Sequence, residues 1–160
     1  MTSFRVGQGL DVHAFGADPT RALVLGGVRL PGPGLEGHSD ADVVVHAVVD
    51  ALLGAAGLGD LGALFGSADP AYADAASEVF LAQTLRRVTA AGWSVGNVDV
   101  TVVAARPRLA PHRSEMAAAL SAMLAVAQDA VSVKATTTDG LGWTGRGEGI
   151  ACLAVALLHR

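Results

Sequence analysis

Two short stretches near the start of the chain carry residue types that bind divalent metal ions. Asp11 and His13 are two residues apart, so a strand would project both side chains from one face. The stretch from His38 to His46 holds two histidines and two aspartates in nine residues. Two imidazoles and one carboxylate suit zinc or a similar ion and leave a fourth position open. Asp11, His13 and His46 are therefore a candidate metal site, and ordinary polar contacts are the competing interpretation.

The second stretch also has the pattern of a helix start. Ser39 is a good N-cap residue, and Asp42 three positions later resembles a capping box. We therefore predict a helix from Asp40 to about Gly54. His38 would then stand at the mouth of the helix, where free backbone N–H groups favour anions.

Helical spacing assigns different roles to the polar residues of this predicted helix. Asp42, His46 and Asp50 follow one another at intervals of four and would share one face. His38 would lie about two turns from His46, which suits a hydrogen-bond donor to an anion better than a fourth metal ligand. Either Asp42 or Asp50 is a candidate for orienting the His46 imidazole from behind.

The remaining pattern predicts the elements that must position these side chains. The Gly26-Gly27 pair interrupts one strand as a hairpin turn or a bulge. With 160 residues and no internal repeat, we expect a single domain over residues 1–160. The predicted strands cover residues 4–14, 22–30, 97–104, 131–138 and 150–158, and the other predicted helices cover 75–91 and 112–126. Periodicity also allows a short helix over 150–158.

Two glycine-rich loops are candidate substrate-binding segments. The loop of about twenty residues around Asp60, running from 54 to 70, is of a length typical of an active-site flap or of a mobile connection. The loop from 139 to 149 combines backbone N–H groups, hydroxyls and Arg146, which suit phosphate oxygens. A tight loop with no ligand is the alternative for the second segment.

Composition excludes several classes of protein. A net charge of −4 argues against non-specific nucleic-acid binding. Cys152 is the only cysteine, so neither an internal disulfide nor a cysteine-based zinc site is available, in keeping with a reducing cytoplasm. The first residues do not resemble a signal peptide, and the longest apolar run, 150–158, is too short to cross a bilayer. We expect a soluble cytoplasmic protein with no membrane partner.

Eight motifs in order make the chain resemble the 2-C-methyl-D-erythritol 2,4-cyclodiphosphate synthase family over essentially its whole length. The motifs are Asp11–Phe15, Leu25–Arg29, His38–His46, Asp50–Ala56, Leu58–Gly62, Gly96–Thr101, Val133–Thr138 and Thr144–Ala151.

The resemblance implies a fold and an activity. The family has an α+β fold with a four-stranded, mainly mixed sheet and helices on one face, and assembles as a homotrimer with sites between subunits. It cyclises 4-diphosphocytidyl-2-C-methyl-D-erythritol 2-phosphate with release of CMP in the non-mevalonate isoprenoid pathway. The 2-phosphate of the substrate attacks the β-phosphorus, so the reaction needs no enzyme nucleophile.

The resemblance also implies residue roles. It places Zn2+ or a similar ion on Asp11, His13 and His46, and Mg2+ or Mn2+ between the substrate phosphates near Asp139. His38 and Thr137 would stabilise the transition state. The methylerythritol end would contact residues 60–62 and 65–69, and the cytidine diphosphate would contact 104–110 and 136–139. The full set of implied substrate contacts is Asp11, Val12, His13, His38, Ser39, Asp60, Leu61, Gly62, Phe65, Asp69, Ala104, Pro107, Arg108, Ala110, Ala135, Thr136, Thr137, Thr138, Asp139, Trp143 and Arg146.

Three positions depart from the family pattern, and two other function classes compete. Asp139 stands where the family usually has Glu, Trp143 where it has Phe, and Ser67 where it commonly has Asp. The shorter arm of Asp139 would hold magnesium through water or more weakly. A metal phosphohydrolase would release a linear product instead of a cyclic one, and a non-catalytic trimer would bind isoprenoid or nucleotide ligands without turnover.

Overall fold

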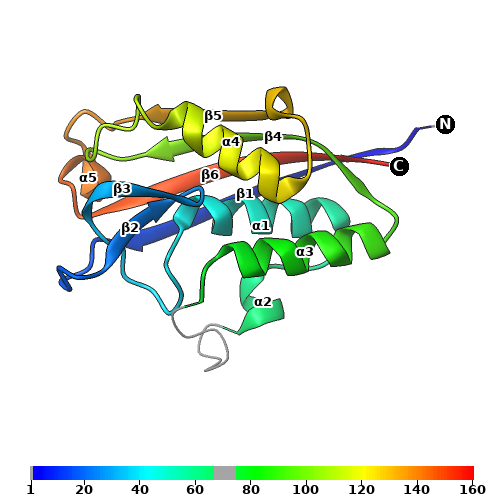
Figure 1. Ribbon diagram of the computed structural model, residues 1–160, viewed down its shortest axis with the longest axis horizontal. Helices are drawn as coiled ribbons and strands as arrows, with labels where there is room; N and C mark the ends of the chain where they lie inside the picture. Colours follow the sequence, from blue (N-terminus) through cyan, green and yellow to red (C-terminus); the bar gives the residue numbers. More distant parts are fainter. Residues whose placement is uncertain (1, 67–74) are drawn as a thin grey trace.

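A four-stranded sheet forms the centre of the molecule. The computed structural model describes residues 2–66 and 75–160. The sheet has the order β1-β6-β4-β5, in which β1 and β4 both pair antiparallel with β6, whereas β4 and β5 pair parallel. The strands are β1 (Phe4–Ala14), β4 (Ser94–Val103), β5 (Val131–Thr136) and β6 (Gly149–His159) (Figure 1).

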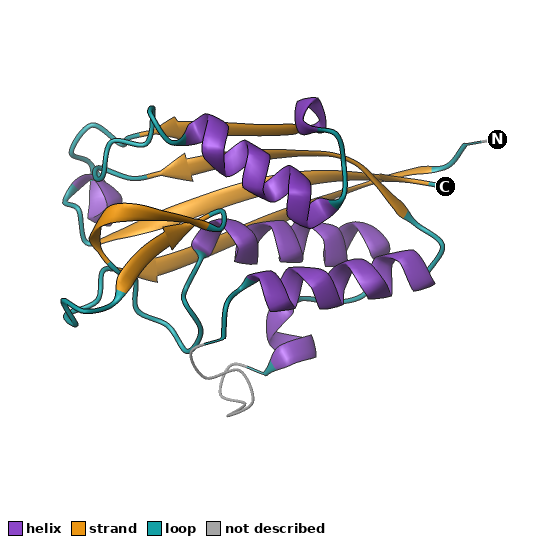
Figure 2. Cartoon of the chain, viewed as in Figure 1, coloured by secondary structure: helices purple, strands orange, loops and turns teal. Residues whose placement is uncertain are grey.

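Three longer helices cover one face of this sheet (Figure 2). They are α1 (Val43–Ala56), α3 (Glu78–Ala90) and α4 (Arg113–Leu124). Helix α1 packs on β1 and β6, α4 packs on β5, and α3 packs against both helices. The predicted α+β fold, with a four-stranded mixed sheet and helices on one face, is therefore confirmed.

Smaller elements complete the described part of the chain. The Gly26-Gly27 pair makes a hairpin turn, one of the two predicted alternatives, and the resulting hairpin is a separate two-stranded sheet. Both glycines have positive φ, which such a turn requires. The smaller elements are β2 (Ala22–Leu25), β3 (Val28–Pro33), α2 (Leu61–Phe65), a 3-10 turn at Gln128–Ala130 and α5 (Gly142–Gly145).

Two glycines let β1 and α1 approach until their backbones touch. A Cβ atom built on Gly7 would lie 2.0 Å from the carbonyl oxygen of Ala51, and one on Gly9 would lie 1.9 Å from that of Ala47. Because side chains alternate along a strand, the same face of β1 continues with Asp11 and His13. The close approach therefore brings α1 directly beside the predicted metal ligands.

The predicted start of α1 was wrong. The helix begins at Val43 with Asp42 as N-cap, not at Asp40 with Ser39 as N-cap. One oxygen of Asp42 accepts hydrogen bonds from the N–H groups of Val44 and Val45, both at 3.1 Å. The carboxylate also accepts from the backbone N–H groups of the β2–β3 turn, so tertiary contacts select Asp42 over the local Ser39 motif.

Two predicted loops contain short helices instead. Asp60, itself extended, caps α2, with its Oδ1 accepting from the N–H of Ala63 at 2.8 Å. Helix α5 interrupts the loop after β5. Helix α1 also continues past Gly54 and ends at Ala56, where Gly57 adopts the left-handed conformation. The packing of α1 thus outweighs the weak helix propensity of an internal glycine.

The sheet face opposite the helices exposes apolar side chains. On β1, Phe4, Val6 and Leu10 are 61%, 68% and 55% exposed, and Leu153 and Val155 of β6 are also exposed. Apolar patches of this kind on a protein surface are typical of interaction sites. In residues 2–66 and 75–160, no helix is long and apolar enough to cross a membrane.

Candidate metal centre

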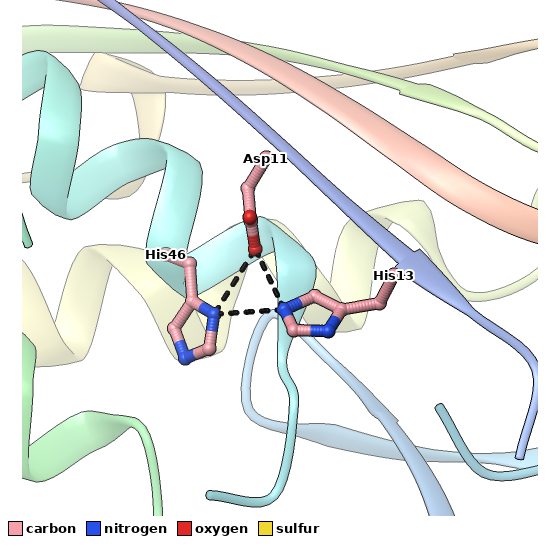
Figure 3. Close-up of side chains that lie close together, drawn as sticks. All are labelled: Asp11, His13 and His46. Atoms are coloured by element: carbon pink, nitrogen blue, oxygen red, sulfur yellow. Dashed lines mark hydrogen bonds and ion pairs between the residues drawn. The ribbon is translucent and has the colours of Figure 1, made fainter. Parts of the chain in front are cut away.

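The three predicted metal ligands converge on one point. The Oδ2 atom of Asp11 lies 3.0 Å from both His13 Nε2 and His46 Nδ1, and the two nitrogens are 3.2 Å apart. Asp11 and His13 project from the same face of β1, and His46 meets them from the first turn of α1 (Figure 3). Strand alternation and the helix position together produce this arrangement, as the sequence predicted.

The hydrogen bonds behind the two rings define which nitrogens carry protons. His13 Nδ1 lies 2.5 Å from the carbonyl oxygen of Glu36, which can only accept, so Nδ1 carries the proton. His46 Nε2 lies 2.9 Å from the hydroxyl of Ser77 and 3.3 Å from that of Ser39. In its neutral form His13 therefore presents an unprotonated Nε2 to Asp11, and the hydroxyls beside His46 can accept a proton from its Nε2 and leave its Nδ1 unprotonated.

This set of donors fits a divalent cation. Three acceptor atoms at 3.0–3.2 Å repel one another unless a proton or a cation lies among them. Zinc with bonds of about 2.0–2.1 Å would hold tetrahedral ligands roughly 3.3 Å apart, close to the observed spacing. The three residues would hold such an ion and would leave one position for a further ligand.

The charges at the cluster favour an anionic Asp11. Burial alone would raise the pKa of this carboxyl, but the hydrogen bonds and charges of His13 and His46 bring it well below its usual range. Burial alone would lower the pKa of His13, but Asp11 raises it above its ordinary value. The cluster thus attracts positive charge, which an ion would supply in place of a proton.

The cluster opens into a pocket of about 180 Å³. His38 and Ser39 line the pocket beside the candidate metal ligands, and apolar side chains of α2 and α3 form the other wall. The ring of Phe80 contacts His46 edge-on at 5.9 Å between centroids and packs against Phe65 at 5.0 Å. The lining residues are Asp11, His13, His38, Ser39, His46, Leu61, Phe65, Gly66 and Phe80.

A second pocket of about 230 Å³ lies where β4 and β5 end. It brings together most of the residues predicted to hold cytidine and diphosphate. Its lining residues are Ala104, Ala105, Pro107, Arg108, Leu109, Ala110, Ala135, Thr136 and Thr137. The two predicted transition-state residues, His38 and Thr137, therefore line different pockets of one chain.

The other residues predicted to contact substrate at this end of the molecule have differing positions in the structure. Asp60 caps α2, and Gly62 lies within that helix. The N–H of Leu61 donates to Asp50 Oδ1 at 2.7 Å. Val12 points to the opposite sheet face and is 46% exposed. Asp69, and Ser67 beside it, lie outside the described residues.

The predicted contacts after β5 form a local hydrogen-bonded loop. Thr137 Oγ1 lies 2.9 Å from Asp139 Oδ1, and Thr138 Oγ1 lies 3.0 Å from the hydroxyl of Thr144. Trp143 is half-buried in α5. Arg146 forms an ion pair with Glu148 at 2.6 Å, within the same chain.

The sequence analysis missed Ser77 and assigned its role to other residues. Asp42 and Asp50 were candidates for orienting His46, but the hydroxyl of Ser77 holds the ring instead. Asp42 lies within the core, where burial raises its pKa to about 6 against the opposing effect of three backbone N–H groups. Ser77 is 31 residues from His46 and falls inside the helix predicted over residues 75–91, so no sequence signal marked it out.

Known sequences resemble the chain along nearly its full length. The model of the YgbB family matches residues 4–159. A 2-C-methyl-D-erythritol 2,4-cyclodiphosphate synthase from Cronobacter sakazakii is 55% identical over 157 residues, covering 98% of each chain. The enzyme of the same name from Rubrobacter xylanophilus is 55% identical, covering all of this chain and 98% of its own.

Solved structures share the fold. The bifunctional IspDF of Campylobacter jejuni superposes with a TM-score of 0.94 at 39% identity, covering 99% of this chain. The chain spans 43% of that longer protein. The CDP complex of Plasmodium falciparum IspF has a TM-score of 0.85 at 33% identity, covering 98% of this chain and 96% of its own.

Proposed function

The chain belongs to the YgbB family, and from this premise we infer that it is an enzyme that cyclises 4-diphosphocytidyl-2-C-methyl-D-erythritol 2-phosphate. The products are 2-C-methyl-D-erythritol 2,4-cyclodiphosphate and CMP, in the non-mevalonate isoprenoid pathway. The cluster of Asp11, His13 and His46, open to a pocket, is the observation that carries the proposal. The reaction class is that of a phosphorus–oxygen lyase, and we place it in the cytoplasm within a single domain, residues 1–160.

The chemistry requires charge stabilisation more than a nucleophile. The attacking phosphate and the diphosphate are both anionic, so each positive group near the reacting oxygens lowers the barrier. A divalent ion, proposed to be zinc, would be held by Asp11, His13 and His46 and would withdraw charge from phosphate oxygens. His38 and Ser39 line the same pocket, where their side chains are available to bind and orient the substrate phosphate.

We assign the cytidine diphosphate end to the second pocket. Its Arg108 supplies positive charge, and Thr136 and Thr137 supply hydroxyl groups for the diphosphate. A second ion, Mg2+ or Mn2+, would be held near Asp139, whose carboxylate lies next to the Thr137 hydroxyl. The Plasmodium falciparum relative is a CDP complex, which supports a cytidine diphosphate-linked ligand.

We further propose a homotrimer in which neighbouring chains complete each site. Strands β1 and β5 are opposite edges of the sheet, and three strand spacings of about 4.8 Å separate them by roughly 14 Å. One chain therefore carries the two pockets at separate edges, with His38 in one and Thr137 in the other. The exposed apolar face of β1 and β6 offers the surface through which copies would associate.

Product analysis tests the function. The purified chain, incubated with the cytidine substrate, zinc and magnesium, is expected to release CMP and the cyclic diphosphate, and a chelator is expected to stop the reaction. His46→Ala should lose both zinc and turnover while it keeps its fold, whereas His112→Ala at the start of α4 should retain both.

Other products would point to the competing functions. CMP released with a linear phosphate product would support a metal phosphohydrolase. Ligand binding without turnover, with both ions supplied, would support a non-catalytic binding protein. Full activity of His46→Ala would overturn the ligand assignment.

A further inference from the structure

Ser77 occupies a capping position but is turned away from it. The residue is the N-cap of α3, yet within the described part of the chain its hydroxyl caps no N–H of that helix. A serine at this position normally accepts a bond from the first turn. The hydroxyl instead lies 2.9 Å from His46 Nε2, and Ser77 as a whole is only 1% exposed.

Asp40 fixes the direction of this hydrogen bond. Its Oδ1 accepts the hydroxyl proton of Ser77, and its Oδ2 accepts the backbone N–H of Ser77 at 3.0 Å. The backbone N–H of Asp40 in turn donates to the carbonyl oxygen of Ala75 at 3.0 Å. Because the hydroxyl gives its proton to a carboxylate, its oxygen is left to accept the Nε2 proton of His46.

This chain of bonds leaves the other nitrogen of His46 unprotonated. In Figure 3 one ring nitrogen of His46 faces Asp11 and His13, and the second points away from the cluster. The hydroxyl of Ser39 is a weaker partner for that second nitrogen, at 3.3 Å, and it already accepts the N–H of Ala41. His13 differs, since a neutral backbone carbonyl holds its outer nitrogen.

We propose that Ser77 and Asp40 are positioning residues for the metal ion. They hold the His46 imidazole in its metal-binding tautomer and, through the charge of Asp40, strengthen it as a ligand. Partners behind a ligand commonly act this way and affect metal affinity tenfold to a hundredfold. The proposal deepens the proposed function and rests on the metal site assigned there.

Zinc binding to the purified chain tests the proposal without use of the reaction. Competition with a chromophoric chelator should show Ser77→Ala binding zinc about tenfold to a hundredfold more weakly than the unaltered protein. Asp40→Asn should weaken binding in the same direction, and Ser77→Thr, which keeps the hydroxyl, should restore most of it. Ser121→Ala removes another buried hydroxyl, which bonds within α4, and should leave zinc affinity unchanged.

A spectroscopic readout separates positioning from loss of structure. In the zinc-bound protein, the Nε2 proton of His46 should be visible by ¹⁵N NMR as a slowly exchanging, hydrogen-bonded signal, and Ser77→Ala should shift it and speed its exchange. If Ser77→Ala loses its helical circular dichroism, the zinc affinity and the His46 Nε2 signal of Asp40→Asn test the positioning role instead.

Failure of the positioning role and failure of the metal site would give different results. Zinc affinity within twofold of the unaltered protein in both Ser77→Ala and Asp40→Asn, with the Nε2 signal unchanged, would overturn the inference alone. Absence of zinc binding in the unaltered protein would overturn the metal site and this inference with it.

Discussion

At the scale of single residues, the side chain of Asp42 accepts hydrogen bonds from two separate elements, whereas a helix cap alone involves one. Its two oxygens accept N–H groups from Val44, Val45, Gly26 and Gly27 at 2.7–3.1 Å. One buried side chain thereby joins the first turn of α1 to the β2–β3 turn. The position of His46, one turn into the same helix, depends on that connection.

Removal of this side chain should destabilise the fold strongly. Asp42→Ala leaves buried N–H groups without acceptors and removes a helix cap, so we expect a loss of about 3 kcal/mol or more in the free energy of unfolding. Urea denaturation followed by circular dichroism measures the loss. Asp129→Ala, at an exposed position in the 3-10 turn, serves as control and should change stability by less than about 0.5 kcal/mol.

Cys152 should be unreactive at pH values where thiols normally react. Burial raises the pKa of its thiol, and the negative charges of Asp42 and Asp11 raise it further. A free thiol reacts faster with a disulfide reagent as pH rises toward about 8.5. Because the folded-state pKa of Cys152 lies above that range, its labelling should stay slow from pH 7 to 9 and become fast in urea.

A matched control places a thiol on an exposed position of the same sheet. Ser132→Cys in a chain that also carries Cys152→Ala should react quickly in the folded state and show the ordinary rise with pH. Rapid labelling of Cys152 in the folded protein would contradict its burial.

The sequence brought together the three candidate metal ligands because each followed from a local rule. Strand alternation placed Asp11 and His13 on one face, and the helical pattern after Asp42 placed His46 in the first turn of α1. No local spacing rule links Ser77 to His46, because their contact depends on how α3 packs against α1. The start of α1 was misplaced for a similar reason, since the N–H groups that select Asp42 belong to a hairpin fifteen or sixteen residues earlier.

At the scale of elements, the contact of β1 with α1 controls the geometry of the candidate metal centre. Two ligands lie on the strand and one on the helix, so any change in the distance between these elements separates the ligands. Gly7 and Gly9 set that distance.

Two glycine substitutions, one in each of the touching elements, should have opposite effects. Gly9→Ala would place a methyl group 1.9 Å from the carbonyl oxygen of Ala47, so we expect a loss of about 3 kcal/mol in stability and weaker zinc binding. Gly54→Ala, within α1, meets no atom closer than the carbonyl oxygen of Gln8 at 4.0 Å and should add up to about 1 kcal/mol. Thermal unfolding and chelator competition measure both effects, and equal stability of the two variants would contradict this account.

At the scale of the whole molecule, the apolar outer face of the sheet and the separation of the two pockets both support the proposed homotrimer. Leu10→Glu places a charge in the middle of that face, where Leu10 is 55% exposed in the single chain. We expect sedimentation to show a trimer for the unaltered protein and smaller species for the variant. Val79→Glu, at an exposed apolar position on α3, is the matched control and should sediment as the unaltered protein does.

Activity should fall together with assembly. If each site takes His38 from one chain and Thr137 from another, dissociated Leu10→Glu should bind zinc normally but lose turnover. A fully active monomer would show that one chain holds a complete site. The sequence indicated this assembly only through family resemblance, because alternation on β1 predicts an outward face but not what covers it.

The pairing of the first strand with the last has a consequence for synthesis on the ribosome. Among the described strands β1 pairs with β6 alone, and because β6 begins at Gly149, about 7–30 s of translation separate the two. Helix α1 can dock on the glycine face of β1 long before then. The three candidate metal ligands all lie within the first 46 residues, so a nascent chain can bring them together while the sheet still lacks its other three strands, β4, β5 and β6.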